Sequence, residues 1–479
     1  TPRSLTEPIV KYTLEPLVYE GPSEGKPEEE WQLKSPGELL ELKICDMAMG
    51  SGAFLVQTCR YMSELLVEAW ERAEKKYPGA SGITVEGEPV NGKTDVITVP
   101  LDTDDRLALA MRLTVDRCLY GVDKNPMAVE MAKLSLWLVT MQKNIPFTFL
   151  DHALKCGDSL LGITDLNQIK YFHLEPEKGK EFHRYFDYAE LCASAVEKAV
   201  EKRNILEKFI IKDTEDFKRK KQLNEEAELA VQKVKFIGDL IIGAAMGTAT
   251  IKKKDAFEEE LYNFGTKSCR GEGTLPFEML NRGNPNKQEP RKTFHWALEF
   301  PEVFEKGGFD CIIGNPPFQG GQKITGILGT DYRDYLVRHL AKDKRGSADI
   351  CAYFFLRSGE ISRNNGGFGL LATNTIAQGD TREVGLEQIV NNGSVIYRAV
   401  PSRKWPGEAS LEVGEIWGRK GEWKGNCFLE EKKVHGITPF LTVPSKVQGK
   451  PYRLKANEGK SFQGSIVLGM GFVLTPEEA

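Results

Sequence analysis

Residues 309–318, FDCIIGNPPF, end an apolar, strand-like segment in an amide, two prolines and an aromatic ring. Proline fixes the backbone and lacks an amide donor, so Asn-Pro-Pro is also an ordinary way to end a strand and begin a loop. Adjacent prolines would in addition stiffen the backbone, so that the Asn315 side-chain oxygen and the Pro316 carbonyl point the same way. Two such acceptors suit both hydrogens of an exocyclic amine that acts as a nucleophile, and Phe318 offers a stacking face. The catalytic candidates are Asn315, Pro316, Pro317 and Phe318.

A glycine turn follows an earlier apolar segment. In ICDMAMGSGAF, Asp46 ends the strand, and Gly50 and Gly52 precede a helix. Small residues let a ligand approach the backbone, and a helix N-terminus favours an anionic group. The same turn is also a common strand-to-helix connection, and the dinucleotide-binding pattern requires a third glycine where Leu55 stands. The turn therefore predicts a ligand crevice at the carboxyl ends of parallel strands and argues against NAD.

Two further acids follow strand-like segments. YGVDKNP places Asp123 where a carboxylate can accept two hydrogen bonds from a ribose diol. KCGDSLLG places Asp158 and Ser159 where a carboxylate can bind an adenine amino group, with Leu160 able to pack on the ring. Each acid alone is more often a helix cap. Asn125-Pro126 is also expected to cap and open the next helix, at 127–141. Three acids after three successive strands together predict a pocket for a nucleoside that carries an amino-acid-like tail.

The elements that must position these residues alternate along the chain. Strand-like and helix-like periodicities alternate over residues 41–141 and predict a doubly wound, parallel α/β sheet with a β-hairpin insertion at 82–99, turning at Asn91 and Gly92. Residues 171–287 are rich in Glu and Lys and predict long helices, at 188–209, 213–236 and 254–261, whose charges form a solvated face. Sheet patterning resumes at residue 308 and continues to residue 417.

Composition limits the class of protein. The chain has 479 residues, of which 41% are hydrophobic and 28% charged, as in soluble globular proteins. No apolar run approaches the roughly 20 residues of a membrane span, and residues 236–245 predict a buried helix instead. The nine cysteines include no Cys-x-x-Cys, so we expect no metal site, reduced thiols and a cytoplasmic protein. The net charge of −5 neither supports nor excludes a nucleic-acid partner.

In order and in type, these motifs resemble the S-adenosylmethionine-dependent amino-methyltransferases of DNA. The resemblance is closest to the gamma-type adenine-N6 enzymes, above all the large ones of type IIG restriction-modification and phage-defence (BREX- or DISARM-like) systems, and it covers nearly the whole chain. TPRSLTEPIV is similar to the tail of the first motif, and DMAMGSGAF to the glycine turn, with Met47 in place of the usual proline. FHWALEFPEVFEKGGFDCIIGNPPF is a long match to the catalytic loop and its approach.

The resemblance implies a Rossmann-like class I methyltransferase fold and methyl transfer from S-adenosylmethionine to the N6 amine of a flipped adenine in double-stranded DNA. Phe318 and Trp405 would stack on the target base, although Trp405 also suits a structural role. Lys323 is a candidate phosphate contact in a mobile glycine-rich loop, and Asp349 a helix cap or supporting residue. The implied cofactor-binding residues are Thr1, Asp46, Ala48, Gly50, Ser51, Gly52, Asp123, Lys124, Asn125, Asp158, Ser159, Leu160 and Asn315.

The sequence also departs from the type IIG pattern. No nuclease module is visible ahead of the methyltransferase, and only the approach to a target-recognition domain follows the last strand. We therefore expect a core from something larger, with a nuclease, other defence subunits or a fused recognition domain as partners, and no membrane. The predicted divisions are residues 1–165 and 296–435 for the two halves of the core, 166–295 for a helical insertion and 436–479 for a linker toward the recognition region.

Rival interpretations remain open from sequence. A protein glutamine methyltransferase also presents a planar amide to such a loop, though those proteins lack a long helical insertion. Cytosine-N4 methylation would keep the mechanism and change the base, although that group more often begins its motif with Ser or Thr. A non-enzymatic DNA-binding subunit of a defence system, retaining only the pocket, is the remaining alternative.

Overall fold

The computed structural model describes residues 1–92, 97–141, 146, 148–182, 188–209, 211, 213–248, 275–407 and 411–445. Two compact units divide the chain, residues 1–443 and 444–479, and every described helix and strand lies in the first of them. The predicted helix at 254–261 and most of the linker region 436–479 lie outside the described residues. No helix among the described ranges is long and apolar enough to cross a membrane.

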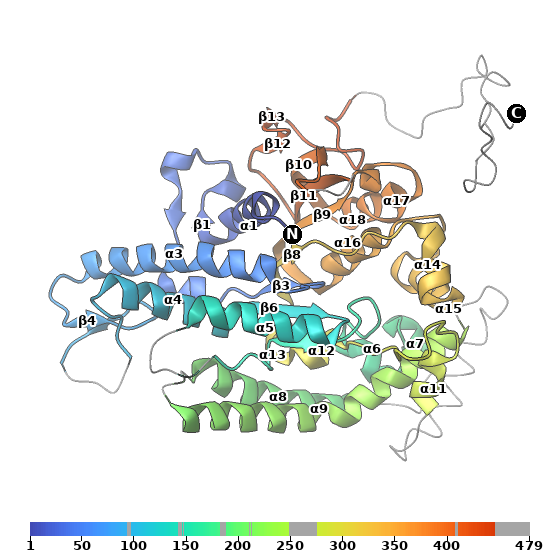
Figure 1. Ribbon diagram of the computed structural model, residues 1–479, viewed down its shortest axis with the longest axis horizontal. Helices are drawn as coiled ribbons and strands as arrows, with labels where there is room; N and C mark the ends of the chain where they lie inside the picture. Colours follow the sequence, from blue (N-terminus) through green and yellow to red (C-terminus); the bar gives the residue numbers. More distant parts are fainter. Residues whose placement is uncertain are drawn as a thin grey trace, which may run out of the picture. The chain divides into compact units, whose positions relative to one another are not determined.

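A nine-stranded, mostly parallel sheet forms the centre of the first unit (Figure 1). Its order is β13-β12-β10-β11-β9-β8-β3-β6-β7, and the run from β9 to β7 is parallel throughout. β11 is antiparallel to both of its neighbours. The strands are β3 (Ile44–Asp46), β6 (Leu119–Asp123), β7 (Leu154–Cys156), β8 (Phe309–Gly314), β9 (Ser362–Thr373), β10 (Ser394–Lys404), β11 (Glu412–Lys420), β12 (Cys427–Leu429) and β13 (Lys432–Val434). The predicted doubly wound α/β fold is confirmed.

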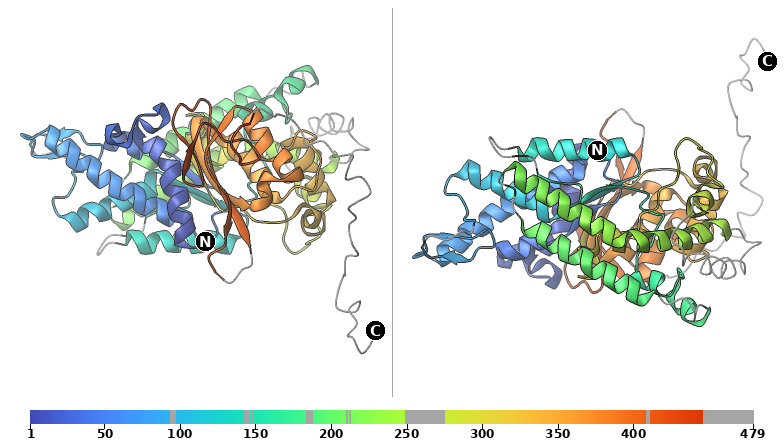
Figure 2. Two further views of the ribbon diagram at one scale, coloured as in Figure 1. Left: turned by 90° about the horizontal axis from the view of Figure 1, so that it is seen from above. Right: turned by 90° about the horizontal axis from the view of Figure 1, so that it is seen from below.

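Helices cover both faces of this sheet (Figure 2), which is why its central strands are apolar on both sides. Successive residues of β8 point to opposite faces: Ile312 packs in one core cluster, and Cys311 and Ile313 in the other. One face carries α1 (Arg3–Val18), α3 (Ala53–Lys76), α4 (Thr103–Arg117) and α5 (Pro126–Thr140). The other carries α8 (Ala189–Lys208), α9 (Thr214–Thr248), α16 (Ile350–Ile361) and α18 (Leu386–Asn391).

Shorter elements complete the unit. β1 (Tyr19–Glu20) pairs with β2 (Gln32–Leu33) near two 3-10 turns, η1 (Pro22–Glu24) and η2 (Glu28–Glu30), and α2 (Pro36–Leu40) precedes β3. The remaining short elements are α6 (Leu166–Lys170), α7 (Pro176–Phe182), α11 (Leu275–Asn281), α12 (Trp296–Glu299), α13 (Pro301–Phe304), α14 (Gly321–Leu328), α15 (Thr330–Tyr335), η4 (Leu336–Leu340), η5 (Asn374–Ala377) and α17 (Gly379–Val384).

The insertion hairpin differs in detail from its prediction. β4 (Gly82–Ile83) pairs with β5 (Pro89–Val90) through a turn between residues 83 and 89, and Thr84 also forms an antiparallel bridge with Thr98, on the far side of the predicted turn at Asn91 and Gly92. The left-handed backbone of Gly87, whose φ is +89°, makes that earlier turn possible.

The helical segment between β7 and β8 lies under the sheet as the long pair α8 and α9 (Figure 1). Its charges do not all form the predicted solvated face. Lys220 of α9 is fully buried, and its ammonium group donates to both carboxylate oxygens of Asp116 at 2.6 and 2.7 Å. Arg203 of α8 is 2% exposed and donates to the backbone carbonyls of His152 and Glu299. These buried cations fasten the helical pair to Asp116 at the end of α4, to the loop before β7 and to α12.

α9 also continues twelve residues beyond its predicted end, to Thr248, and the buried helix expected at 236–245 is its final part. Gly238 permits this, because a Cβ there would lie 2.7 Å from the ring of His295. Asp239 accepts hydrogen bonds from Thr293 Oγ1 at 2.5 Å and shares one with His295 Nε2 at 3.1 Å. Gly238 and Asp239, which interrupt the apolar run, therefore contact residues 293–295.

Gly314, the last residue of β8, has a φ of +151°, and a Cβ there would lie 2.6 Å from Asp46 Oδ1. We expect Gly314→Ala to lower the free energy of unfolding by roughly 1–3 kcal/mol, because both the backbone and the neighbouring strand end must shift. Urea unfolding measures the change. Gly320→Ala is the matched control, since a Cβ at that residue meets nothing within 4 Å and φ is −53°. Equal stability of the two variants would contradict this account.

Candidate active site

Three acids meet at one edge of the sheet, as predicted. Asp46, Asp123 and Asp158 lie at or just after the carboxyl ends of the adjacent strands β3, β6 and β7. The loop of residues 315–318, with the sequence NPPF, leaves β8 at the same edge. A cavity of about 360 Å³ opens there, lined by Met47, Ala48, Asp123, Lys124, Gly157, Asp158, Ser159, Leu160, Asn315, Pro317, Gln319, Leu328, Tyr332, Ile350 and Phe354.

Asp46 lies behind the part of the cavity that Met47 and Ala48 line. It is 1% exposed, and its Oδ1 accepts the Ala48 backbone N–H at 3.0 Å. Its Oδ2 is buried and has no hydrogen-bond partner among the described residues. Burial, with the nearby charge of Asp123, raises the pKa of Asp46 to about 7. A cationic or N–H-bearing ligand would satisfy this oxygen.

The glycine turn connects two of the acids. Gly50 has a left-handed φ of +54°, and its N–H donates to Asp123 Oδ2 at 2.9 Å. Gly52, also left-handed, lies where a Cβ would come 3.2 Å from the Cβ of Ala132 in α5. Ser51 is exposed. These three residues shape the turn and its helix packing, whereas the neighbouring Met47 and Ala48 line the cavity.

Asp123 and the residues after it form the start of α5. Asp123 Oδ1 accepts the Asn125 N–H at 2.8 Å, and Asn125 Oδ1 in turn caps the helix through the Met127 N–H at 2.9 Å. Asn125 is therefore a capping residue, as the capping interpretation of such motifs predicts. Lys124 is exposed and lines the cavity.

Asp158 has a partner that sequence reasoning missed. Tyr332 of α15 directs its hydroxyl at both carboxylate oxygens of Asp158, each at 2.9 Å, while the Leu160 N–H donates to Oδ1 at 3.1 Å. Burial and the adjacent carboxylate raise the pKa of Tyr332 well above its ordinary value, so the phenol remains a donor. Arg291 holds Asp331, the residue before Tyr332, through two hydrogen bonds of 2.6 and 2.8 Å.

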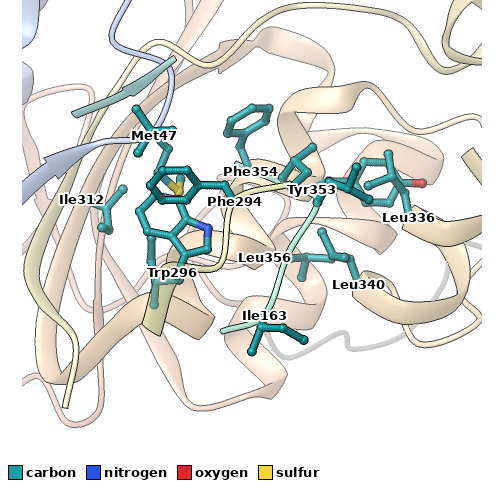
Figure 3. Packing of buried hydrophobic residues seen from close by; sticks show 14 of the residues in the cluster. Met47, Ile163, Phe294, Trp296, Ile312, Leu336, Leu340, Tyr353, Phe354 and Leu356 are labelled. Carbon is teal, nitrogen blue, oxygen red and sulfur yellow. The ribbon is translucent and has the colours of Figure 1, made fainter. Parts of the chain in front are cut away.

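Residues 291–295 run beside residues 157–163 and support the pocket from below. The Asp158 N–H donates to Lys292 O at 3.0 Å, and the Phe294 N–H donates to Leu161 O at 2.8 Å. A Cβ at Gly162 would lie 1.9 Å from Phe294 O. Figure 3 shows Phe294 and Trp296 packed beside Met47, with Phe354 of α16 nearby. Ser159 is tied to the same region, since its Oγ donates to Met47 O at 2.5 Å.

The NPPF loop, residues 315–318, presents a hydrogen-bond acceptor that has no donor among the described residues. Asn315 Nδ2 donates to Thr1 Oγ1 at 3.3 Å, while Asn315 Oδ1 is buried and has no partner among the described residues. Pro316 is buried and Pro317 exposed. Phe318 is half-buried and packs against both core clusters, so one part of its ring is anchored.

Two predicted DNA-side residues lie outside the cavity lining. Lys323 is exposed, but it belongs to α14 rather than to a mobile loop. The helix forms there because Gly321 packs closely on Ser347 and Ala348, where a Cβ would lie 2.4 Å from the Ser347 carbonyl carbon. Trp405 follows β10, is half-buried and packs against one core cluster.

Asp349 is a helix cap, as one of its two predicted roles states. Its Oδ1 accepts the N–H groups of Cys351 and Gln319, each at 3.1 Å, and so joins α16 to the residue that follows the NPPF loop. No cluster of three or more His, Cys, Asp or Glu side chains in the described part of the chain could hold a metal ion.

Comparison with known proteins agrees with this geometry. The model of the Eco57I restriction-modification methylase family matches residues 117–396, more than half of the chain. The chain belongs to this family. The DNA-methyltransferase domain of MmeI also matches, over residues 26–172, and the two matches together extend over the glycine turn, the three acids and the NPPF loop of this restriction-modification methylase.

One curated relative of the methylase is a putative type II restriction enzyme and methyltransferase from Methanocaldococcus jannaschii, 22% identical over 380 residues. The match covers 71% of this chain and 27% of that protein, so the chain spans about a quarter of its relative's length. Among solved structures, MmeI in complex with DNA is 15% identical with a TM-score of 0.40, covering 86% of this chain and 36% of MmeI. The M protein of EcoKI is 9% identical with a TM-score of 0.31, covering 83% and 46%.

Tyr332→Phe removes the hydroxyl donor from a buried carboxylate. We expect the free energy of unfolding to fall by roughly 1.5–3 kcal/mol, the usual loss for a hydrogen bond to a charged group. Chemical denaturation at neutral pH measures it. Tyr353→Phe is the control, since Tyr353 is equally buried and burial is the main cause of its raised pKa. A loss of the same size in both variants would show that Asp158 does not depend on the phenol.

Asp46 makes stability depend on pH. Its folded pKa of about 7 exceeds its ordinary value of 3.8, so the folded protein binds a proton that the unfolded chain releases between these values. Stability contributed by this proton is complete below about pH 4 and is lost as pH rises to about 7, by at most about 4 kcal/mol. We expect Asp46→Asn to remove this component. Unfolding curves at several pH values would contradict the assignment if wild type and variant had parallel profiles.

Proposed function

We propose that this methylase transfers a methyl group from S-adenosylmethionine to the exocyclic N6 amine of an adenine flipped out of double-stranded DNA, within a restriction-modification or phage-defence system. The observation that carries the proposal is Asn315 Oδ1, which is buried without a partner among the described residues at a cavity lined by Asp123 and Asp158. A buried acceptor without a donor is costly, so the site is complementary to a ligand that brings an amine.

The residues present fit S-adenosylmethionine. When bound, the cofactor supplies an electrophilic methyl group on a sulfonium. Asp123 would accept hydrogen bonds from its ribose hydroxyls, and Asp158 from its adenine amino group, with Leu160 packed on the ring. The unpartnered Oδ2 of Asp46 suits the cationic amino-acid end, and the backbone of Ala48 faces the same cavity.

The loop residues then position the nucleophile. Thr1 Oγ1 engages the Asn315 amide nitrogen, which leaves the amide oxygen as the atom available to an incoming amine. Asn315 Oδ1 and the Pro316 carbonyl would accept the two amino hydrogens and direct the nitrogen lone pair into the cavity. Catalysis rests on this positioning and on exclusion of water, and a proton leaves the nitrogen after transfer.

The target base must leave the duplex to reach this loop. Phe318 would stack on it, a role supported by its partial burial and its packing against both core clusters. Trp405 would cover the opposite face, and Lys323 would contact a phosphate. A second candidate, methylation of a protein glutamine, presents the same planar amide, and the assay below separates the two.

The deciding experiment uses the chain with tritiated S-adenosylmethionine and mixed genomic DNA, followed by nucleoside digestion and chromatography. Label in N6-methyladenine supports the proposal. Label in N4-methylcytosine would overturn the choice of base, and bound cofactor without label in DNA would overturn DNA as the substrate of this chain.

Two variants separate chemistry from cofactor binding. We expect Asn315→Ala to lower the rate of methyl transfer at least about 100-fold, because the amine loses its orienting acceptor, with cofactor affinity changed less than about threefold. Asp123→Ala should instead weaken cofactor binding about tenfold or more. Calorimetry and single-turnover kinetics measure the two quantities. Retention of most activity by Asn315→Ala would contradict the role proposed for the loop.

A further inference from the structure

The outward face of α5 is apolar. The exposed fractions are 66% for Met127, 51% for Met131, 52% for Leu134, 61% for Leu138 and 63% for Met141, the residue that follows the helix. A helix on a protein surface normally carries charged or polar residues on the face opposite its core stripe. Single exposed apolar residues are ordinary, but a continuous row of them marks an interaction surface.

The spacing of this row is that of a coiled-coil seam. Its members follow one another at intervals of four, three, four and three residues, the heptad pattern by which two helices pack side by side. The inward face of α5 is separate, since Val129, Ala132 and Leu136 are buried in the core cluster below. α5 thus has one apolar stripe that packs in the core of its own chain and a second apolar stripe that no described element covers. It crosses the front of the molecule in Figure 1 and forms an edge in both views of Figure 2.

We propose that the apolar row of α5 is the contact between two copies of this chain, which pair through an antiparallel two-helix seam. If the two α5 helices run antiparallel, with a twofold axis between residues 132 and 133, Met127 lies against Leu138 of the second copy. The same axis places Met131 against Leu134 of the second copy. Met127, Met131, Leu134 and Leu138 therefore form four layers, each of which pairs one methionine with one leucine. The two side chains are similar in size, and the adaptable methionine thioether fills uneven gaps.

The charges beside the row are compatible with this pairing. Glu130 would face Ser135 of the second copy, so no like charges oppose each other. Lys133 is already engaged, with its ammonium group 2.8 Å from Glu130 and 2.6 Å from Asp151. A helix that lies on a membrane surface carries free Lys and Arg along its polar flank. α5 has only this one cation, which favours a protein partner over a lipid surface.

The size of the row predicts a weak dimer. A helix of fifteen residues is about 22 Å long and about 10 Å wide, so it offers a few hundred Å² of contact. That area is below the roughly 800 Å² per partner of stable complexes. We therefore expect association in the micromolar range, dependent on protein concentration.

Sedimentation equilibrium of the 479-residue chain, from about 1 to about 200 μM, tests the pairing. The wild type should form dimers, and Met131→Lys or Leu134→Glu should each weaken dimerisation at least about tenfold, because each buries a charge against an apolar residue. Mixing the two variants should restore dimers, since the introduced ammonium group of one chain would then face the introduced carboxylate of the other. Leu229→Glu is the control, because Leu229 is 71% exposed on α9 and its substitution should leave dimerisation unchanged.

Circular dichroism and thermal midpoints establish that the variants remain folded, which their half-exposed positions favour. A monomer at every concentration would overturn the proposal, as would dimers that survive both single substitutions. Dimers that are lost in each variant but not restored by mixing would overturn the antiparallel register. These outcomes do not depend on methyl transfer, so they are distinct from a failure of the proposed function.

Discussion

The parallel pairing of β3 with β6 on one side and β8 on the other is the constraint on which the site depends. Asp46 lies in register with Gly121 and Ile313, so all three strands reach the same edge within two residues of one another. Because strands of a parallel sheet end on the same side, whatever follows each of them must share one crevice. Acids that are 77 and 112 residues from Asp46 in sequence, and an amide 269 residues away, therefore become neighbours.

The long helical segment between β7 and β8 must leave this register undisturbed. Its two ends are held together, because residues 291–295 lie directly against residues 157–163. Its middle is held by buried cations of α8 and α9, which bind acceptors of the core. A buried ion pair contributes little net stability but strongly penalises any arrangement that separates its charges. Lys220 and Asp116 thus specify where the helices dock more than how firmly the protein folds.

The site residues whose positions follow from strand order could be predicted from the sequence. Those whose positions depend on contacts between distant parts of the chain could not. Asp46, Asp123, Asp158 and Asn315 each follow an apolar strand, and a parallel sheet then requires them to converge. Tyr332 carries no such signal, because its approach to Asp158 depends on α15 being held by Arg291 from another part of the chain. The helical state of residues 321–328 was missed for a related reason, since glycine in this segment serves close packing and not flexibility. Asn125 shows the opposite case, in which the local capping interpretation was correct.

The position of β11 sets an order for synthesis. β11 lies between β9 and β10, although it follows both in sequence, so these two strands are not joined until residue 420 has been made. The first helix also docks late, because Ile9 O accepts the indole N–H of Trp417, and Tyr12 O accepts the hydroxyl of Tyr397. A nascent chain therefore carries an unpaired edge on β9 until β11 has been made, and exposed strand edges are prone to aggregate. A chain that ends before residue 412 lacks the strand that joins β9 to β10, whereas one that extends past β13 carries every strand of the nine-stranded sheet.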